Sequence, residues 1–174
     1  DRSKKPHQQA NPDAYVHVVE RNAKGIVISG TKAIVTGGPY MHEFLVMPSR
    51  NMGRNDADFA VCCAVPVDAK GVTIVSRAAG RPGEKLEYGD ALFSRKYGQS
   101  TAVVMFDKVF VPWERVFYES EWELSNVLTY SYATHHRHSC IAARAGFGDL
   151  LIGAGALMCE ANGLDPATKS NLRE

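Results

Sequence analysis

The stretch from Tyr15 to Pro48 constrains the fold of this chain more than any other, because short β-rich runs alternate there with turn residues. Val, Ile and Tyr dominate three runs, which are separated by Asn22 to Gly25 and by Gly37 to Pro39. β-Branched and aromatic residues favour strands, whereas Gly, Pro and Asn favour the turns that join them. The sequence therefore predicts a meander of three strands.

The central strand of this meander ends in a small hydroxyl residue, Thr36, followed by Gly37 and Gly38. Because glycine has no Cβ, backbone amides and the Thr36 hydroxyl can come close to a flat polar ligand at such a strand end. An ordinary strand and turn has the same spacing, so the residues alone leave both interpretations open.

Further strand signals follow in the first two thirds of the chain. Phe59 to Val65 is a continuous apolar run typical of a buried strand, and Val72 to Ser76 and Thr101 to Val111 are two more β signals. Arg77 to Arg95 is rich in Gly, Pro and charge, and it predicts a long excursion that borders a functional site. Pro112 to Arg115 is expected to close the sheet, because proline cannot continue the ladder.

The hydrophobic pattern changes to helical spacing from Ser120 onward. Ser120 is a suitable N-cap with acidic residues in the turn that follows, and apolar residues recur at helical spacing as far as Asn162-Gly163. The chain is thus predicted to be an α+β protein. We expect a β domain over residues 1–118 and helices over residues 119–174.

Composition excludes several classes of partner. The formal net charge of +1 predicts neither a nucleic-acid partner nor an anionic-membrane partner. We find no apolar run long enough to span a bilayer and no signal-peptide pattern, so no membrane association is expected. The four cysteines, Cys62, Cys63, Cys140 and Cys159, form no C-x-x-C pair. A reducing, cytoplasmic setting is the prediction.

Two polar segments are candidates for ligand binding. Residues 1–13 are polar and punctuated by proline, which predicts an extended loop. Arg2 and Lys5 supply cations there, while Gln8 and Gln9 supply amides, a set suited to a phosphate and ribose clamp. A solvated tail is the alternative interpretation.

The second segment, Thr134 to Cys140, holds three histidines and a thiol. These residue types bind metals or move protons near neutral pH. His136 and Cys140 are four residues apart, so a helix would place them on one face. A polar helix face with one buried histidine is the alternative.

The run GIVISGTKAIVTG, followed by HEFLVMP, resembles the flavin-contacting strands in the middle β domain of acyl-CoA-dehydrogenase-like flavoproteins. Together with FDKVFVPWERVF and HHR…AGFGDLLIGAGAL, it most resembles one family of this group. That family joins 4-hydroxybutyryl-CoA dehydratase/vinylacetyl-CoA isomerase to the oxygenase component of 4-hydroxyphenylacetate 3-monooxygenase. The resemblance covers nearly the whole chain.

The resemblance implies a middle β domain, a barrel or sandwich, followed by the start of a C-terminal helical bundle. It also implies a fragment that lacks an N-terminal helical region, and a homotetramer or homodimer. FAD is the implied cofactor. Its implied binding residues are Arg2, Lys5, Gln8, Gln9, Thr36 and Gly37.

The chain departs from the dehydratase pattern where an iron–sulfur cluster would be held. In the dehydratase, a histidine that matches His136 and a cysteine seven residues later are ligands of a [4Fe–4S] cluster. The later position is Ala143 here, and a methyl group cannot replace a thiolate ligand. Thr101 stands where the dehydratase has a catalytic glutamate, and Cys140 stands where it has a tyrosine. A metal role for His136 and the cluster itself are therefore doubtful.

Three functions follow from the resemblance. The first is a flavin-dependent lyase or isomerase of a short acyl-CoA, with His136 as acid or base and Thr36 beside the flavin. The second is an aromatic hydroxylase that uses FADH2 on a phenol and is supplied by a flavin reductase. The third is a non-catalytic paralogue that serves as an oligomer subunit.

Overall fold

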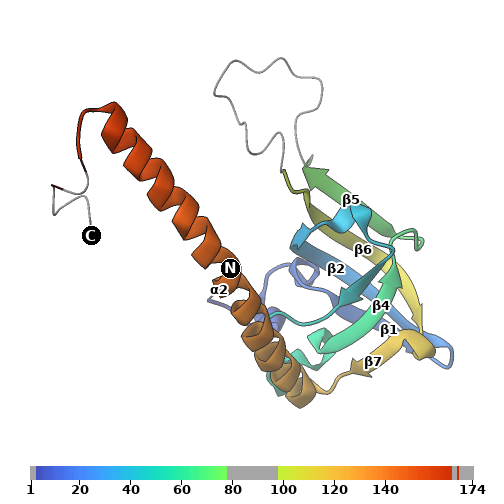
Figure 1. Cartoon of the computed structure of the whole chain (residues 1–174). Helices are drawn as coiled ribbons and strands as arrows, with labels where there is room; N and C mark the ends of the chain where they lie inside the picture. The colour runs from blue at the N-terminus through green and yellow to red at the C-terminus, as the bar shows by residue number, and fades with distance from the viewer. Residues whose placement is uncertain (1–2, 78–97, 166–167, 169–174) are drawn as a thin grey trace. The chain divides into compact units, whose positions relative to one another are not determined.

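The computed structural model describes residues 3–77, 98–165 and 168 of the chain (Figure 1). Two compact units are distinguished, Asp1–Thr129, which contains the strands, and Tyr130–Glu174. Most of the predicted excursion from Arg77 to Arg95 lies outside the described residues.

Four antiparallel strands form the larger sheet, in the order β1-β2-β6-β5. The strands are β1 (His17–Asn22), β2 (Gly25–Thr36), β5 (Val72–Arg77) and β6 (Thr101–Pro112). β1 and β2 are joined by the predicted turn, and β2 ends at Thr36 as predicted. The third run of the meander also forms a strand, but it belongs to the other sheet.

The smaller sheet has the order β3-β4-β7 and is also antiparallel. It consists of β3 (Glu43–Val46), β4 (Val61–Pro66) and β7 (Val116–Glu119). Pro112 ends β6, but the chain passes through a short 3-10 helix, η5 (Trp113–Arg115), and then pairs with β4. The expectation that residues 112–115 close the sheet is thus wrong, because the chain leaves one sheet only to join the other.

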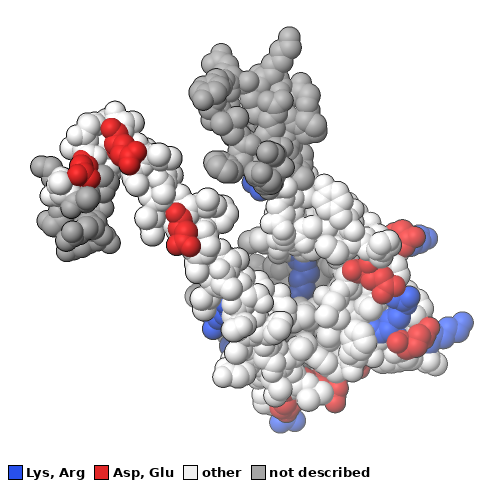
Figure 2. Space-filling model, in the orientation of Figure 1, with Lys and Arg blue, Asp and Glu red and all other residues white. Residues whose placement is uncertain are grey.

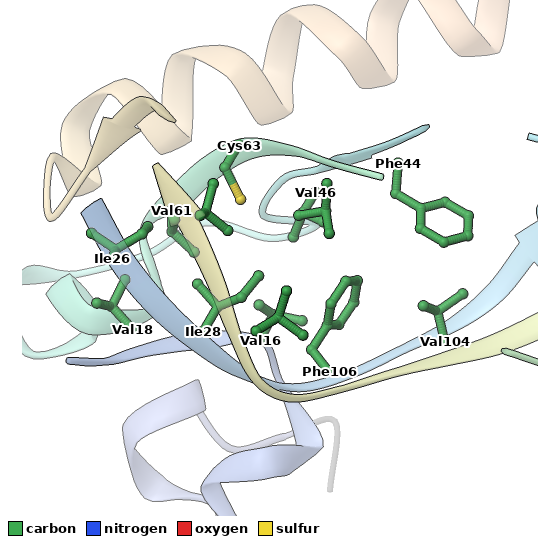
Figure 3. Packing of buried hydrophobic residues seen from close by; sticks show 13 residues of the cluster. Val16, Val18, Ile26, Ile28, Phe44, Val46, Val61, Cys63, Val104 and Phe106 are labelled. Carbon is green, nitrogen blue, oxygen red and sulfur yellow. The ribbon is translucent and has the colours of Figure 1, made fainter. Parts of the chain in front are cut away.

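The core lies between the two sheets (Figure 3). Strands of the larger sheet contribute Ile26, Ile28, Val104 and Phe106, and strands of the smaller sheet contribute Phe44, Val46, Val61 and Cys63. Alternate residues of β6 are buried, as expected for a strand with one face on a core. The described strands therefore form a sandwich of two sheets, not a closed barrel.

The described residues include four other 3-10 helices: two precede β1, one lies between β2 and β3, and one lies between β3 and β4. They are η1 (Pro6–Gln8), η2 (Pro12–Ala14), η3 (Gly38–Tyr40) and η4 (Arg54–Phe59).

In the part of the chain that the structure describes, one α-helix, α2 (Trp122–Ala161), follows the strands. It ends as predicted, because Gly163 takes a left-handed conformation with φ of 71° and its amide bonds the carbonyl oxygen of Glu160. Figure 2 shows long stretches of α2 without charged side chains.

By length and composition α2 could cross a membrane, and none of its most apolar stretch is buried in this structure. This corrects the expectation that no apolar run is long enough, although Arg137, Arg144 and Asp149 interrupt the helix. Exposed apolar surface of this extent is typical of a contact with a membrane or with more protein.

Candidate functional site

The end of β2 has an irregular backbone that shapes the predicted ligand seat. The pairing with β6 shifts register between Lys32 and Val35, which marks a β-bulge. Within it, Ile34 has a φ of 61°, a conformation that is strained for a β-branched residue. Gly37 follows with a φ of 73°, where glycine has no steric penalty. Such strain is concentrated at functional sites in proteins.

Thr36 and Gly37 have different roles at this strand end. The amide of Gly37 donates to the carbonyl oxygen of Ser100 at 2.9 Å, so it is not free for a ligand. A ligand contact at Gly37 would therefore be made through another of its atoms, and the prediction that Gly37 lies against the cofactor stays a prediction. The Thr36 side chain is exposed, and its hydroxyl makes no hydrogen bond within the described part of the chain. The hydroxyl is the polar group that a ligand would meet.

An open hollow of about 550 Å³ lies on the larger sheet beside this strand end. Its lining comprises Ala33, Ile34, Val75, Ser76, Arg77, Thr101, Ala102 and Val103. Thr36 is not part of the lining, but Thr101 is its partner in the β2–β6 ladder. Ile34 is 75% exposed on one wall, and Arg77 supplies a cation. An apolar wall with one cation and nearby hydroxyls fits a flat, partly charged cofactor such as FAD.

The predicted clamp residues lie together on and beside η1. The Lys5 Nζ donates to the Asn51 carbonyl oxygen at 3.2 Å, and the Gln9 Nε2 donates to the Lys4 carbonyl oxygen at 3.1 Å. Gln8 accepts from the Lys5 backbone amide at 2.9 Å. An ammonium has three donors, so Lys5 keeps capacity for a phosphate while it holds Asn51. Arg2 lies outside the described residues.

Residues 47–53, the connector segment, run between β3 and η4 and link these parts. Lys32 of β2 donates from its Nζ to the Met47 carbonyl oxygen at 2.6 Å. At the other end, the Asn126 amide of α2 accepts from the Met52 amide at 2.7 Å and donates to its carbonyl oxygen at 3.1 Å. Arg50 donates to the Lys4 carbonyl oxygen at 2.9 Å.

Lys32 was not identified from the sequence as a site residue. Its amine is withdrawn from water, and this burial lowers the pKa of Lys32 from 10.5 to about 8. The sequence signal that could have identified Lys32 is its position as the single cation of a predicted strand that is mainly apolar.

Asp56 of η4 also was not identified, and it fixes the loop that carries the clamp residues. Asp56 is 1% exposed and accepts hydrogen bonds from the Gly53 amide, the His7 amide and the His7 Nδ1, at 2.9, 3.1 and 2.6 Å. Burial alone would raise the pKa of Asp56, but these hydrogen bonds outweigh it and lower the pKa below its ordinary value.

His136 lies on the exposed surface of α2, in the second unit. Its ring stacks on Tyr132 with centroids 5.7 Å apart, and its Nε2 is 3.5 Å from the Cys140 sulfur. The helix therefore places Tyr132, His136 and Cys140 on one face, as the spacing predicted for the last two. Among the described residues, no three His, Cys, Asp or Glu side chains gather to hold a metal. Ala143 is exposed one turn beyond Cys140.

Comparison with solved structures shows the fold and two related activities. A 4-hydroxybutyryl-CoA dehydratase from N. maritimus is 36% identical, covers 94% of this chain and gives a TM-score of 0.80. The oxygenase component of 4-hydroxyphenylacetate 3-monooxygenase, complexed with FAD and 4-hydroxyphenylacetate, is 32% identical over 92% of this chain, with a TM-score of 0.72. A steroid acyl-CoA dehydrogenase variant, at 16% identity and a TM-score of 0.55, shares the fold.

Curated relatives and family models agree with these structures. The 4-hydroxybutyryl-CoA dehydratase/vinylacetyl-CoA-Δ-isomerase of Clostridium aminobutyricum is 35% identical over 97% of this chain and 35% of its own length. The chain spans about a third of the length of the relatives that it matches. The model for the 4-hydroxyphenylacetate 3-hydroxylase N terminal matches residues 1–118, and the model for its C terminal matches residues 125–173. The chain therefore belongs to the 4-hydroxyphenylacetate 3-hydroxylase family.

Proposed function

We propose that this chain is the flavin-contacting part and first helix of an FAD-dependent lyase or isomerase that acts on a short acyl-CoA. The observation that carries the flavin assignment is the exposed, unpartnered hydroxyl of Thr36 beside the hollow on the larger sheet. Related solved structures are described as complexes with FAD. The acyl-CoA substrate is favoured by the higher identity and TM-score of the dehydratases.

The β-rich unit has groups suited to the ring and to the diphosphate of FAD. The Thr36 hydroxyl would donate to a polar group of the flavin ring, and the exposed Ile34 side chain would supply an apolar contact. Arg77 and Lys5 are cations suited to the diphosphate. When bound, FAD supplies the electron-accepting chemistry that the side chains lack.

His136 is the residue of the second unit that is suited to proton transfer. A neutral imidazole can take the proton from the carbon next to the thioester carbonyl, and the imidazolium can return it to another carbon or to a leaving hydroxyl. Return of the proton to another carbon gives an acyl-CoA with a shifted double bond. Its transfer to the leaving hydroxyl gives an unsaturated acyl-CoA and water. Stacking on Tyr132 fixes the ring orientation of His136.

The test uses the complete protein as its gene encodes it. We expect a flavin absorbance spectrum, or uptake of added FAD measured by fluorescence titration. We also expect exchange of the α-protons of vinylacetyl-CoA with solvent deuterium, followed by NMR. Substitution His136→Gln should slow this exchange about 10²–10⁴-fold, the usual contribution of a general base. His138→Gln, at an exposed histidine two residues further along α2 and on another face of the helix, should leave it unchanged. A protein that takes up no FAD would contradict the flavin assignment.

A second function, hydroxylation of a phenol, is favoured by two residues. Ala143 and Thr101 stand where the resemblance to the dehydratase implies a cluster thiolate and a glutamate. Oxygen-dependent consumption of reduced FAD in the presence of 4-hydroxyphenylacetate, without acyl-CoA turnover, would establish it. Iron and acid-labile sulfide in the purified protein would instead favour the dehydratase reaction.

A further inference from the structure

Lys32 carries a buried amine in the middle of β2 that the proposed function leaves unused. Its hydrogen bond to Met47, at 2.6 Å, joins a strand of the larger sheet to the residue that follows β3 of the smaller sheet. Lys32 lies at the start of the bulge that leads through Ile34 to Thr36. The amine thus holds the strand that presents the Thr36 hydroxyl.

Met47 opens the connector segment, and the far end of this segment holds the clamp residues. Lys5 bonds the Asn51 carbonyl oxygen, and Arg50 bonds the Lys4 carbonyl oxygen. Asn126 fixes Met52 through both of its backbone polar groups. The connector segment is therefore bonded to the Thr36 strand at one end and to the η1 loop at the other.

Stability alone does not account for a lysine at this position. Burial lowers the pKa of Lys32 to about 8, and the titratable groups whose charges act on it are the thiols Cys62 and Cys63 of β4. Between pH 8 and 10.5 the unfolded chain binds more protons than the folded chain at this residue, so stability rises with pH. At neutral pH the fold therefore carries a charged amine whose burial is unfavourable.

We propose that Lys32 is a positioning residue that preorganises FAD binding by holding the Thr36 strand end and the η1 loop at a fixed separation through the connector segment. This inference rests on the proposed flavin site. Preorganisation raises affinity because fewer groups must be ordered when the ligand binds.

The test compares Lys32→Met, Lys32→Arg and Lys24→Met in the complete protein at pH 7. Lys32→Met should weaken FAD affinity about tenfold, and Lys32→Arg should restore most of it because a guanidinium can donate to the Met47 carbonyl oxygen. Lys24→Met removes an exposed lysine next to the same strand and should change nothing. Unchanged FAD affinity in Lys32→Met would overturn the proposal, as would an affinity that Lys32→Arg fails to restore.

Hydrogen exchange without FAD separates this proposal from the flavin assignment. In Lys32→Met, the amides of Gly37 and Met52 should exchange faster than in the wild type, because both ends of the tether are released. If the wild type takes up no FAD, the proposed function fails while this exchange still measures the tether. Unchanged exchange at both amides would show that Lys32 does not position them, whatever the protein binds.

Discussion

Asp56 is buried and Lys32 is half-buried, and their surroundings act differently on the two opposite charges. Asp56 accepts three hydrogen bonds, so its carboxylate is favoured despite burial, and its pKa is lowered. Lys32 has a single carbonyl acceptor, so its charge is disfavoured, and its pKa is lowered too. The same direction of shift therefore means a stabilised charge in one residue and a destabilised charge in the other.

For Asp56 we predict a loss of stability on substitution and in acid. Asp56→Asn should reduce the free energy of unfolding by about 2–4 kcal/mol, because it turns an acceptor of three hydrogen bonds into a partial donor. The lowered pKa contributes stability above the ordinary value of 3.8 that is lost as pH falls through the folded-state pKa. Urea unfolding at about pH 6 and about pH 3 measures both effects.

The variant should lose less stability between these pH values than the wild type. Asp68→Asn, an exposed acid on the turn after β4, is the matched control and should change stability by less than about 0.5 kcal/mol. Equal acid sensitivity in Asp56→Asn and the wild type would contradict the role assigned to this carboxylate.

At the residue scale, the sequence predicts Thr36 as a ligand contact from a local signal, a hydroxyl residue followed by two glycines. It also placed Gly37 at a turn that requires a positive φ. It did not identify the His7–Asp56 pair or the Lys32–Met47 bond, because each joins segments that only the folded chain brings together. Nor could it show that the Gly37 amide is already bonded to Ser100.

At the scale of elements, β2 is long and paired on both edges, and a bulge interrupts its pairing near the end that carries Thr36. The strands themselves were predictable from β-branched runs bounded by Gly and Pro. The short strand β7 was not, because four residues after a 3-10 helix carry too little pattern. The bulge was also not predictable, since Ile34 is a residue that ordinarily avoids such a backbone.

We predict that Ile34→Asn stabilises the fold and weakens ligand binding. Asparagine tolerates the left-handed conformation, and the Ile34 side chain is mostly exposed, so the free energy of unfolding should rise by about 1 kcal/mol. FAD affinity should fall because the hollow loses an apolar wall. Urea unfolding and FAD titration measure the two effects.

Val75→Asn is the matched control for Ile34→Asn. Val75 lines the same hollow and is exposed, but it lies in the regular strand β5. Its substitution should lower stability, because asparagine is unfavourable in strands. If both variants lose stability to the same extent, Ile34 is not strained.

At the scale of the whole molecule, α2 has 40 residues and exposes apolar side chains over most of its length. The helix was predictable from its spacing and its Asn-Gly stop. The surface that covers this helix was not predictable, because the chain spans about a third of the length of its relatives. Because the chain belongs to this family, we expect other protein segments, and not a membrane, to cover the apolar side chains of α2.

We predict that the 174-residue chain, produced alone, self-associates through α2. Sedimentation velocity should show a mass that grows with concentration, because uncovered apolar helices pair with one another. The double substitution Ile141→Lys and Leu151→Lys should return the chain to a monomer, whereas His138→Lys, a single added charge on the same helix, should not. A monomeric wild-type chain at all concentrations would contradict this.

The four cysteines differ in burial and reactivity between the strands and the helix. Cys62 and Cys63 are buried on β4, and burial raises the pKa of Cys63 to about 12, so neither thiol reacts readily. Cys140 and Cys159 are half-buried on α2, about 28 Å apart along its axis. An alkylating fluorophore or spin label will consequently tag the helix and spare the sandwich, which turns the native sequence into a ready reporter of whatever docks along α2.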